Sequence, residues 1–403
     1  MSIIQSEKSM MRHETHSNPG FIAPQFPSKL PSLRTFSKSA RPPRSRPFLR
    51  ACARAPLRET EPINQSPLGA PQVLCAGEVL YDLYAPPNTP RTQPELWNRV
   101  PGGGPANVAA ALAQLETGSA FIGMVGDDDA GNALRKALLD MNVNVDGLQQ
   151  ATGRQSRTVF VKVDQDGERD FVGFGGENQS FADTQQIDAE RLPGVLFYAA
   201  KFVMLPTLGL AFEGCASSFS MLLDMAKMCL LESVVDVNWR PVFWQHYSDE
   251  DARKRIRSMV QKVDILKLSV DELSFLYGKQ LADIGLTEPQ TVLNRVGTKG
   301  VLVTDGRNGS AYAFNYGSLV HGRCEAIVPE GGVVDTTGAG DAFLAGFLSR
   351  MLRLGGTAAL VDEDKVKDIV RFATATASFV IAGEGVFGSL PTLKQVEELV
   401  AKL

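Results

Sequence analysis

The chain has 403 residues, of which 44% are hydrophobic, 8% aromatic and 21% charged, and its formal net charge is -4. This composition supplies enough apolar surface for a folded core, and it excludes collagen-like, mucin-like and wholly disordered chains. No run approaches the roughly 18 uninterrupted apolar residues of a membrane-spanning helix, and nothing repeats at a period of about 20 to 50 residues. Transmembrane and solenoid folds are therefore excluded, and no membrane partner is expected.

The first 58 residues differ from the rest in charge and composition. They carry 11 Lys and Arg against two Glu, whereas residues 59–403 hold 43 acidic and 30 basic residues. They are rich in Ser, Arg and Pro and lack the apolar stretch of a secretory signal. We predict a disordered transit peptide and linker over residues 1–70, with a plastid favoured over a mitochondrion because Arg50-Ala51-Cys52-Ala53 resembles a plastid processing site. A disordered tail without an address and a basic nucleic-acid arm are the alternatives; the acidic body would repel a polyanion, so no nucleic-acid partner is expected.

From residue 71 to residue 403, short β-type runs alternate with helical ones, as in a mainly parallel sheet flanked by helices. We predict one α/β domain over this range. The predicted strands are Val73–Val79, Ala120–Val125, Phe202–Leu205, Ser233–Asn238, Asp264–Lys267 and Val301–Thr304. The predicted helices are Val108–Leu115, a segment from the acidic turn Asp127-Asp128-Asp129 through Leu138, Ser217–Leu231, Glu250–Val260, Val270–Tyr277, Glu288–Val296, Asp341–Leu354, Lys365–Ile381 and Leu393–Lys402.

A hairpin pattern interrupts this rhythm. The segments Arg157–Asp164 and Glu168–Phe174 alternate between apolar and polar residues, and Asp166-Gly167 between them is a strong two-residue turn signal. We predict a small lid over residues 157–175, which would exclude water from a reacting site. An ordinary edge hairpin is the alternative. An exposed hairpin edge would also suit pairing of two copies into a homodimer.

The most informative segment precedes the helix predicted to begin at Asp341. Gly338, Ala339 and Gly340 form a turn that opens this helix, so their N–H groups can face an anion with the positive end of the helix dipole behind them. Asp341 lies beside them, where its carboxylate could accept a proton from a hydroxyl. A base next to a phosphate cradle is the minimum for phosphoryl transfer to an alcohol, although a Gly-rich turn with a capping Asp is common in proteins of many kinds.

The full string is more specific than the turn alone. Asp335-Thr336-Thr337-Gly338-Ala339-Gly340-Asp341 resembles the C-terminal signature of the ribokinase, or pfkB, family of carbohydrate kinases. The N-terminal pattern of that family is matched by Gly102-Gly103 with Asn107 and by the turn Gly123-x-x-Gly126-Asp127-Asp128. The resemblance extends from Val73 to about Pro391. It implies a ribokinase-like three-layer α/β/α sandwich with a mainly parallel central sheet and a small β-hairpin lid.

The resemblance also implies the site residues. Asp341 would be the base, and the Gly338–Gly340 amides would stabilise the charge on the transferred phosphoryl group. The implied sugar-binding residues are Asp82, Gly102, Gly103 and Asn107. The implied nucleotide-binding residues are Lys267, Ser269, Thr304 and Gly306, with Glu272 placed to hold Mg²⁺. Ser269 stands where most of the family has Asn, and the family permits a monovalent cation such as K⁺ near the Gly383-Glu384-Gly385 loop.

Two segments bear on the substrate. Asp236-Val237-Asn238-Trp239-Arg240, with Trp244, resembles a stretch shared by fructokinases and 2-keto-3-deoxygluconate kinases, and Arg240 would brace phosphates or the site wall. Arg169 lies in a segment that resembles the fructokinase lid and would contact the substrate, but the continuation Gly175-Gly176-Glu177-Asn178 departs from it. We therefore predict an ATP- and Mg²⁺-dependent kinase that converts fructose to fructose 6-phosphate. The alternatives are a kinase of 2-keto-3-deoxygluconate or another sugar, and an inactive plastid scaffold protein on the same fold.

Motifs of other enzyme classes are missing or misplaced. The chain has neither G-x-x-x-x-G-K-[ST] nor G-x-S-x-G. Gly383–Gly388 matches G-x-G-x-x-G, but it follows a predicted helix rather than a strand, which argues against a dinucleotide site. The five cysteines include no C-x-x-C pair and indicate buried free thiols.

Overall fold

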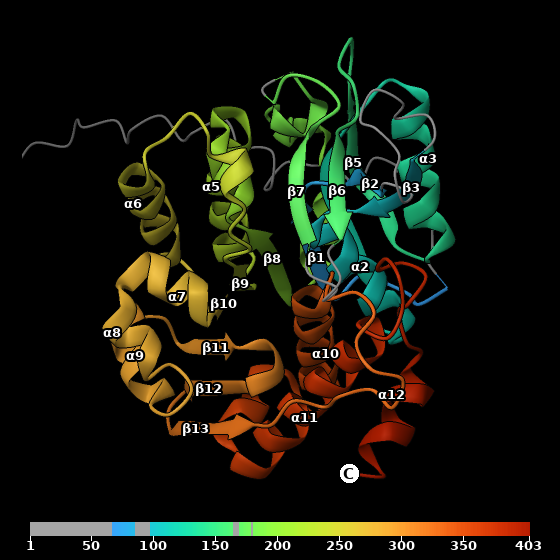
Figure 1. Ribbon diagram of the computed structural model, residues 1–403. Coiled ribbons are helices and arrows are strands. Elements are labelled where there is room, and N and C mark those ends of the chain that lie inside the picture. Colours follow the sequence, from blue (N-terminus) through green and yellow to red (C-terminus); the bar gives the residue numbers. More distant parts are fainter. Residues whose placement is uncertain (1–66, 85–96, 164–168, 179) are drawn as a thin grey trace, which may run out of the picture. The chain divides into compact units, whose positions relative to one another are not determined.

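The computed structural model describes residues 67–84, 97–163, 169–178 and 180–403, all within one unit that spans residues 54–403 (Figure 1). Of residues 162, 163 and 169–172 only the backbone is described. The predicted transit peptide and linker, up to residue 66, and the predicted turn Asp166-Gly167 lie outside the described residues. Across the described ranges, every helix is too short or too polar to cross a membrane.

A nine-stranded sheet forms the centre of this unit. Its strands are β1 (Val73–Gly77), β4 (Ser119–Gly126), β5 (Asn144–Ala151), β8 (Phe202–Pro206), β9 (Glu232–Asp236), β10 (Ile265–Ser269), β11 (Gly300–Thr304), β12 (Ser310–Asn315) and β13 (Leu319–Cys324), in the order β13-β12-β11-β10-β9-β8-β1-β4-β5. Neighbours from β11 to β5 are parallel, whereas β12 and β13 add an antiparallel edge. Strands β1, β4 and β8 are buried at every position, which explains their continuous apolar runs. The mainly parallel sheet is confirmed.

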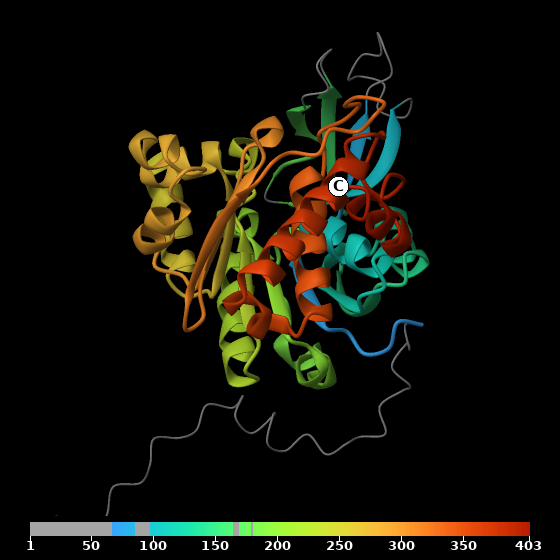
Figure 2. The ribbon, with the colours of Figure 1, turned by 90° about the horizontal axis from the view of Figure 1, so that it is seen from below.

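Helices cover both faces of this sheet. They are α2 (Gly104–Gln114), α3 (Asp129–Asp140), α4 (Gly194–Ala199), α5 (Glu213–Met228), α6 (Asp249–Val260), α7 (Val270–Tyr277), α8 (Lys279–Asp283), α9 (Pro289–Val296), α10 (Ala339–Arg353), α11 (Glu363–Val380) and α12 (Leu393–Val400). Figure 2 shows strands β11 to β13 between α10 and α11 on one side and the α6 to α9 group on the other. Helices α2, α10 and α11 share one hydrophobic core with the sheet, in which Phe121, Phe314 and Phe347 are fully buried. The predicted three layers are confirmed.

A second, four-stranded sheet contains the predicted hairpin and extends it by two strands. Its strands are β2 (Leu80–Tyr84), β3 (Asn98–Gly102), β6 (Thr158–Val163) and β7 (Arg169–Phe174), in the order β3-β2-β6-β7. The β6–β7 pair is the predicted antiparallel hairpin, but β2 pairs parallel with β6 and antiparallel with β3. We call these four strands the small sheet. Strands β2 and β3 were not predicted. The strand expected over Val73–Val79 ends at Gly77, and the chain then enters a different sheet as β2.

The chain crosses between the two sheets after β1, β3, β5 and β7, and the first two crossings are short and lie next to each other. Only Glu78 and Val79 separate β1 from β2, and only Gly103 separates β3 from α2. Gly103 has a φ of 103°, and a Cβ there would lie 2.5 Å from the carbonyl oxygen of Glu78. Only glycine fits such a close approach, so the sequence Gly102-Gly103-Gly104 brings the two crossings together.

Candidate active site

A cavity of about 610 Å³ lies beyond the carboxyl ends of β1, β9, β10 and β11, where the small sheet also contributes to its wall. Open α/β sheets bind ligands at this edge. The residues that line it are Glu78, Leu80, Asp82, Gly103, Gly104, Asn107, Val159, Leu208, Asn238, Arg240, Pro241, Val242, Phe243, Lys267, Ser269, Glu272, Thr304, Thr336, Thr337, Gly338, Gly340 and Asp341. Most of the predicted site residues are therefore brought together here.

Asp341 lies in the first turn of α10, and its side chain is held by two amides from other elements. Asn107 Nδ2 on α2 donates to Asp341 Oδ2 at 2.8 Å, and Asn238 Nδ2, beyond the end of β9, donates to Oδ1 at 3.4 Å. Asp341 is buried yet lines the cavity. Both amides are hydrogen-bond donors, so they fix the orientation of the carboxylate plane.

The turn before Asp341 is shaped by two glycines. Gly338 is the N-cap of α10 with a φ of 71°, and a side chain there would collide with Val386. A Cβ on Gly340 would lie 2.6 Å from Lys267 Nζ, so glycine lets this ammonium group reach the helix end. Of the three amides predicted to face a phosphoryl group, that of Ala339 donates to the Thr336 carbonyl oxygen at 3.3 Å. The positive end of α10 and the Lys267 ammonium together favour an anion at this place.

Of the predicted sugar-binding residues, Asp82, Gly103 and Asn107 line the cavity, whereas Gly102 is not among the lining residues. Asp82 lies on β2 and is 6% exposed, and Asn107 lies one turn into α2. Gly102 is packed against Asp82, because a Cβ on it would lie 2.5 Å from Asp82 Oδ2. The carboxylate, the amide and the bare Gly102-Gly103 backbone present hydrogen-bonding groups of the kind that bind hydroxyls.

Lys267 forms a buried ion pair at the floor of the cavity. Its Nζ lies 3.0 and 3.1 Å from the two carboxylate oxygens of Asp236 on the neighbouring strand β9. Burial disfavours the charge on Lys267, but the carboxylates of Asp236, Glu272 and Asp341 outweigh it and raise the pKa of the lysine. Lys267 is therefore an ammonium ion, and it sits between a strand carboxylate and the start of α10.

Glu272 has a structural function that the sequence reading did not include. Its Oε2 accepts the N–H of Ser269 at 2.8 Å and its Oε1 accepts the N–H of Trp239 at 2.7 Å, while Ser269 Oγ accepts the N–H of Glu272. Glu272 and Ser269 thus form the capping box of α7 and fasten the loop after β9 to this helix. Both residues still line the cavity.

The remaining predicted residues differ in whether they reach the cavity. Arg240 lines the cavity, and its Nη1 donates to the Trp239 carbonyl oxygen at 2.9 Å. Thr304 lines it from the end of β11, whereas Gly306 opens a 3₁₀ turn with a φ of 48° and is not among the lining residues. Arg169 begins β7, but its side chain lies outside the described residues.

Comparison with known proteins identifies the type of site. The family model described as pfkB family carbohydrate kinase matches residues 70–393. The chain belongs to this family. It is therefore a phosphotransferase that acts on a sugar hydroxyl, and the ribokinase-like fold is confirmed.

Three relatives show how far the similarity extends. "Probable fructokinase-6, chloroplastic" of Arabidopsis thaliana is 32% identical over 83% of this chain and 83% of the relative. A fructokinase from Xylella fastidiosa, solved with bound ATP, matches with a TM-score of 0.71 and 26% identity over 82% of this chain and 98% of that chain. A fructokinase from Vibrio cholerae O395, solved with fructose, ADP and calcium ion, matches with a TM-score of 0.68 and 25% identity over 82% of this chain and 99% of that chain.

Two side chains of this carbohydrate kinase were missed by the sequence reading. Asn238 holds Asp341 and has a φ of 44°, a left-handed conformation that Asn tolerates better than most residues. The sequence signal that could have identified Asn238 was its position just beyond a buried strand. Glu78 lines the cavity, and its Oε1 accepts the N–H of Gly104 at 3.0 Å. Burial raises the pKa of Glu78 to about 8, and the charges of Asp183 and Asp341 act in the same direction, whereas hydrogen bonds from main-chain N–H groups oppose it.

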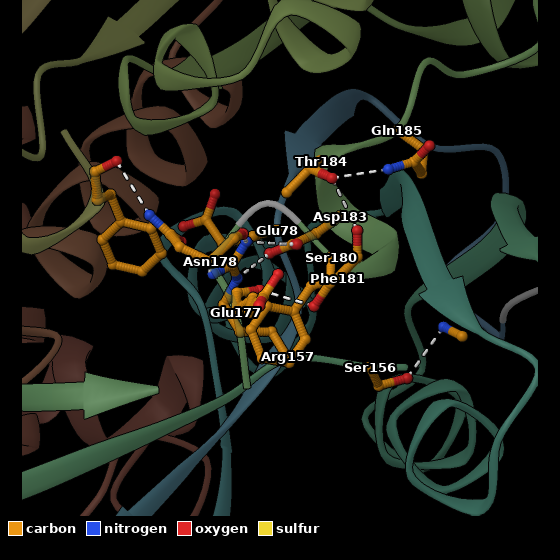
Figure 3. A network of polar contacts seen from close by, with 12 residues as sticks. Glu78, Ser156, Arg157, Glu177, Asn178, Ser180, Phe181, Asp183, Thr184 and Gln185 are labelled. Carbon is orange, nitrogen blue, oxygen red and sulfur yellow. Dashed lines mark hydrogen bonds and ion pairs between the residues drawn. The ribbon is translucent and has the colours of Figure 1, made fainter. Parts of the chain in front are cut away.

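A buried network joins the small sheet to the wall of the cavity (Figure 3). At its centre is Arg157, the residue before β6, whose Nε and Nη2 donate to the two carboxylate oxygens of Asp183 at 2.6 and 2.8 Å. Its Nη1 donates to Asn178 Oδ1 at 2.6 Å, and Asn178 Nδ2 donates to the carbonyl oxygen of Phe243, a cavity residue. The guanidinium carbon also lies 4.5 to 5.2 Å from the ring centres of Phe174, Phe181, Phe212 and Phe243. The base of β6 and this wall are therefore packed as one piece.

Proposed function

We propose that this chain transfers the γ-phosphate of ATP to a primary hydroxyl of a ketose and converts fructose to fructose 6-phosphate. The position of Asp341 carries the proposal, because its oriented carboxylate, in the first turn of α10, lines the same cavity as Asp82 and Lys267. The fructokinase names of the relatives support the choice of sugar. Their bound ATP, ADP and fructose support the choice of nucleotide and acceptor.

In the proposed reaction each part of the cavity has one task. Asp82, Asn107 and the Gly102-Gly103 backbone hold the sugar, with Arg240 and Arg169 as further contacts. Lys267, Ser269, Thr304 and Gly306 lie on the nucleotide side. The sugar oxygen attacks the γ-phosphorus, the bond to the β,γ-bridging oxygen breaks to release ADP, and the hydroxyl proton passes to Asp341. The amides of Gly338 and Gly340 stabilise the transferred group, whereas the Ala339 amide donates within the turn. Positioning and charge stabilisation supply most of the rate.

Magnesium fits the residues present as an ion carried by the nucleotide phosphates and water. The two carboxylate oxygens of Glu272 already accept main-chain N–H groups. Within the described ranges, no three His, Cys, Asp or Glu side chains are grouped so that they could hold a metal ion. Mg²⁺ typically keeps several waters and binds phosphates, so Glu272 and Ser269 would hold it through its water shell while the ion offsets phosphate charge.

A monovalent cation such as K⁺ is proposed near the Gly383-Glu384-Gly385 loop. Asp335 connects this loop to the phosphate-side turn, because its Oδ1 accepts the N–H of Thr337 at 2.9 Å and its Oδ2 accepts the N–H of Gly385 at 3.1 Å. An ion bound to the loop would therefore act on the turn before Asp341 through one carboxylate.

The decisive experiment is an ADP-release assay over fructose, 2-keto-3-deoxygluconate, ribose and adenosine, with Asp341→Asn as the matched inactive control. We expect fructose to give the highest kcat/KM. A higher value with another sugar would move the assignment within the family, towards 2-keto-3-deoxygluconate first. If a folded protein that binds ATP released ADP with none of them, the scaffold alternative would replace the kinase.

We further propose plastid import and dimer formation. The basic, Ser- and Arg-rich segment before residue 59 and the chloroplastic name of one relative support residues 1–70 as a plastid transit peptide and linker before a kinase domain over residues 71–403. Fusion of residues 1–70 to a fluorescent protein tests import.

The edges of the small sheet, β3 and β7, support pairing of two copies, which sedimentation of the purified chain tests.

A further inference from the structure

Glu78 is a buried carboxyl group that the reaction above does not use. It follows β1 directly, is 4% exposed and lines the cavity. Its Oε1 accepts the N–H of Gly104, whereas its Oε2 has no hydrogen-bond partner among the described residues. A charged carboxylate left in this state is costly, because burial removes its water and leaves Oε2 without a donor. The geometry therefore favours the neutral acid.

The side chain is close to the catalytic centre. A Cβ built on Gly104 would lie 3.6 Å from Glu78 Oε1 and 3.4 Å from Asp341 Oδ1. The same point is 2.5 Å from Asn238 Nδ2, the amide that holds the proposed base. Glu78, Asp341 and Asn238 thus converge on one glycine at the start of α2, and the hydrogen bond from Gly104 to Glu78 keeps that glycine in place.

We propose that Glu78 is a positioning residue for phosphoryl transfer, which as a neutral acid holds the Gly103-Gly104 turn beside Asp341 and which stops the reaction when it ionises. This inference rests on the proposed function of Asp341. Ionisation would place a second negative charge beside the base and beside the arriving phosphate groups, and both effects oppose the reaction.

The charged groups around Glu78 favour retention of its proton. After burial itself, Asp183 and Asp341 are the carboxylates that raise its pKa, which lies at about 8. The Asp183 charge is already balanced by Arg157, so that arginine is committed to another partner. On α5, Cys215 also faces this region, and burial followed by the charges of Asp183 and Glu78 raises its pKa, so it remains an uncharged thiol. Glu78 is therefore mostly protonated at neutral pH and ionises above pH 8.

The test is the pH dependence of fructose phosphorylation in the wild type and in Glu78→Gln, because Gln copies the shape of the neutral acid and cannot ionise. We expect Glu78→Gln to remain active, and the kcat/KM of each form is compared with its own value at pH 7. In the wild type, kcat/KM should fall about tenfold per pH unit above pH 8 through this group, and Glu78→Gln should lack this fall. Glu177→Gln is the matched control, because Glu177 is an exposed residue of the same region and its variant should keep the wild-type profile.

A second variant separates positioning from folding. Glu78→Ala removes the hydrogen bond to Gly104, and we expect kcat to fall at least tenfold while the variant still melts cooperatively. Wild-type and Glu78→Gln profiles with the same alkaline fall, or full activity of Glu78→Ala, would overturn the inference even though the wild type is a kinase. An inactive wild type with every sugar would instead refute the proposed function, and the two failures are thus distinguishable.

Discussion

Replacement of Asp341 by Asn tests the assignment of the base most directly. The substitution keeps the size of the side chain and removes its ability to take up a proton. General base catalysis typically contributes a factor of about 10² to 10⁴ in rate, so kcat should fall by this factor, which corresponds to about 3 to 5 kcal/mol of activation free energy.

The structure also predicts the cost of this change in stability. Asn107 Nδ2 at 2.8 Å and Asn238 Nδ2 at 3.4 Å are both amide donors to the Asp341 carboxylate. The new Asn can offer its oxygen to only one of them, and the shorter contact to Asn107 should keep it. Its own NH₂ group then meets the NH₂ group of Asn238, and the lost hydrogen bond should lower the free energy of unfolding by about 1 kcal/mol.

Three measurements test the role of Asp341 as base. A coupled assay gives kcat and KM for fructose, titration calorimetry gives the affinity for ATP, and urea unfolding gives the stability. We expect kcat to collapse while ATP affinity changes less than about threefold, because the proposed nucleotide contacts are Lys267, Ser269 and Thr304 rather than Asp341. A variant that keeps kcat within threefold of the wild type would refute the role of Asp341 as base.

Three further substitutions probe the surroundings of the site. Arg157→Met should lower the free energy of unfolding by about 3 to 5 kcal/mol, because it leaves the buried Asp183 carboxylate without its cation; a loss below 1 kcal/mol in urea unfolding would contradict this. Lys267→Met should lower kcat about 100-fold, and it should also destabilise the protein because the buried Asp236 carboxylate loses its cation. The double variant Lys267→Met with Asp236→Asn should recover the melting temperature but not kcat. Recovery of both would disprove the proposed contact of Lys267 with phosphate. The pKa of Glu78 is raised from 4.5 to about 8 on folding, so the folded state binds an extra proton between these pH values. The free energy of unfolding of the wild type should therefore fall relative to Glu78→Gln by about 1.4 kcal/mol per pH unit from pH 5 to pH 8, and then level off. Parallel stability curves of the two proteins would contradict this prediction.

Local signals predicted the helices of the phosphate side well. The helix predicted over Val270–Tyr277 has the observed bounds, because Ser269 and Glu272 form a capping box that fixes its start. The helix after the Gly338–Gly340 turn was placed within two residues at either end, since an apolar face follows glycines that open it. Such signals depend on neighbours in sequence, so they can be read without the fold.

Long-range pairing was predicted less well. Strand β2 was missed because its partners, β3 and β6, lie in a sheet of their own, and β12 and β13 were missed because they only extend the edge of the large sheet. Asn107 and Asp341 were each singled out, yet the hydrogen bond between them joins residues 234 positions apart and follows only from the packing of α2 against α10. Glu78 carried no signal of its own, because a Glu at the end of a strand is ordinarily a solvated residue.

The two short crossings between the sheets, after β1 and after β3, have a mechanical consequence. At these crossings only Glu78 and Val79 separate β1 from β2, and only Gly103 separates β3 from α2. Glu78 and Gly103 also line the cavity. A movement of the small sheet would therefore bend the chain at the cavity wall itself, while Arg157 and Asp183 anchor the base of β6. A substitution at Glu78 or Gly103 would then alter the shape of the cavity and the freedom of the small sheet together.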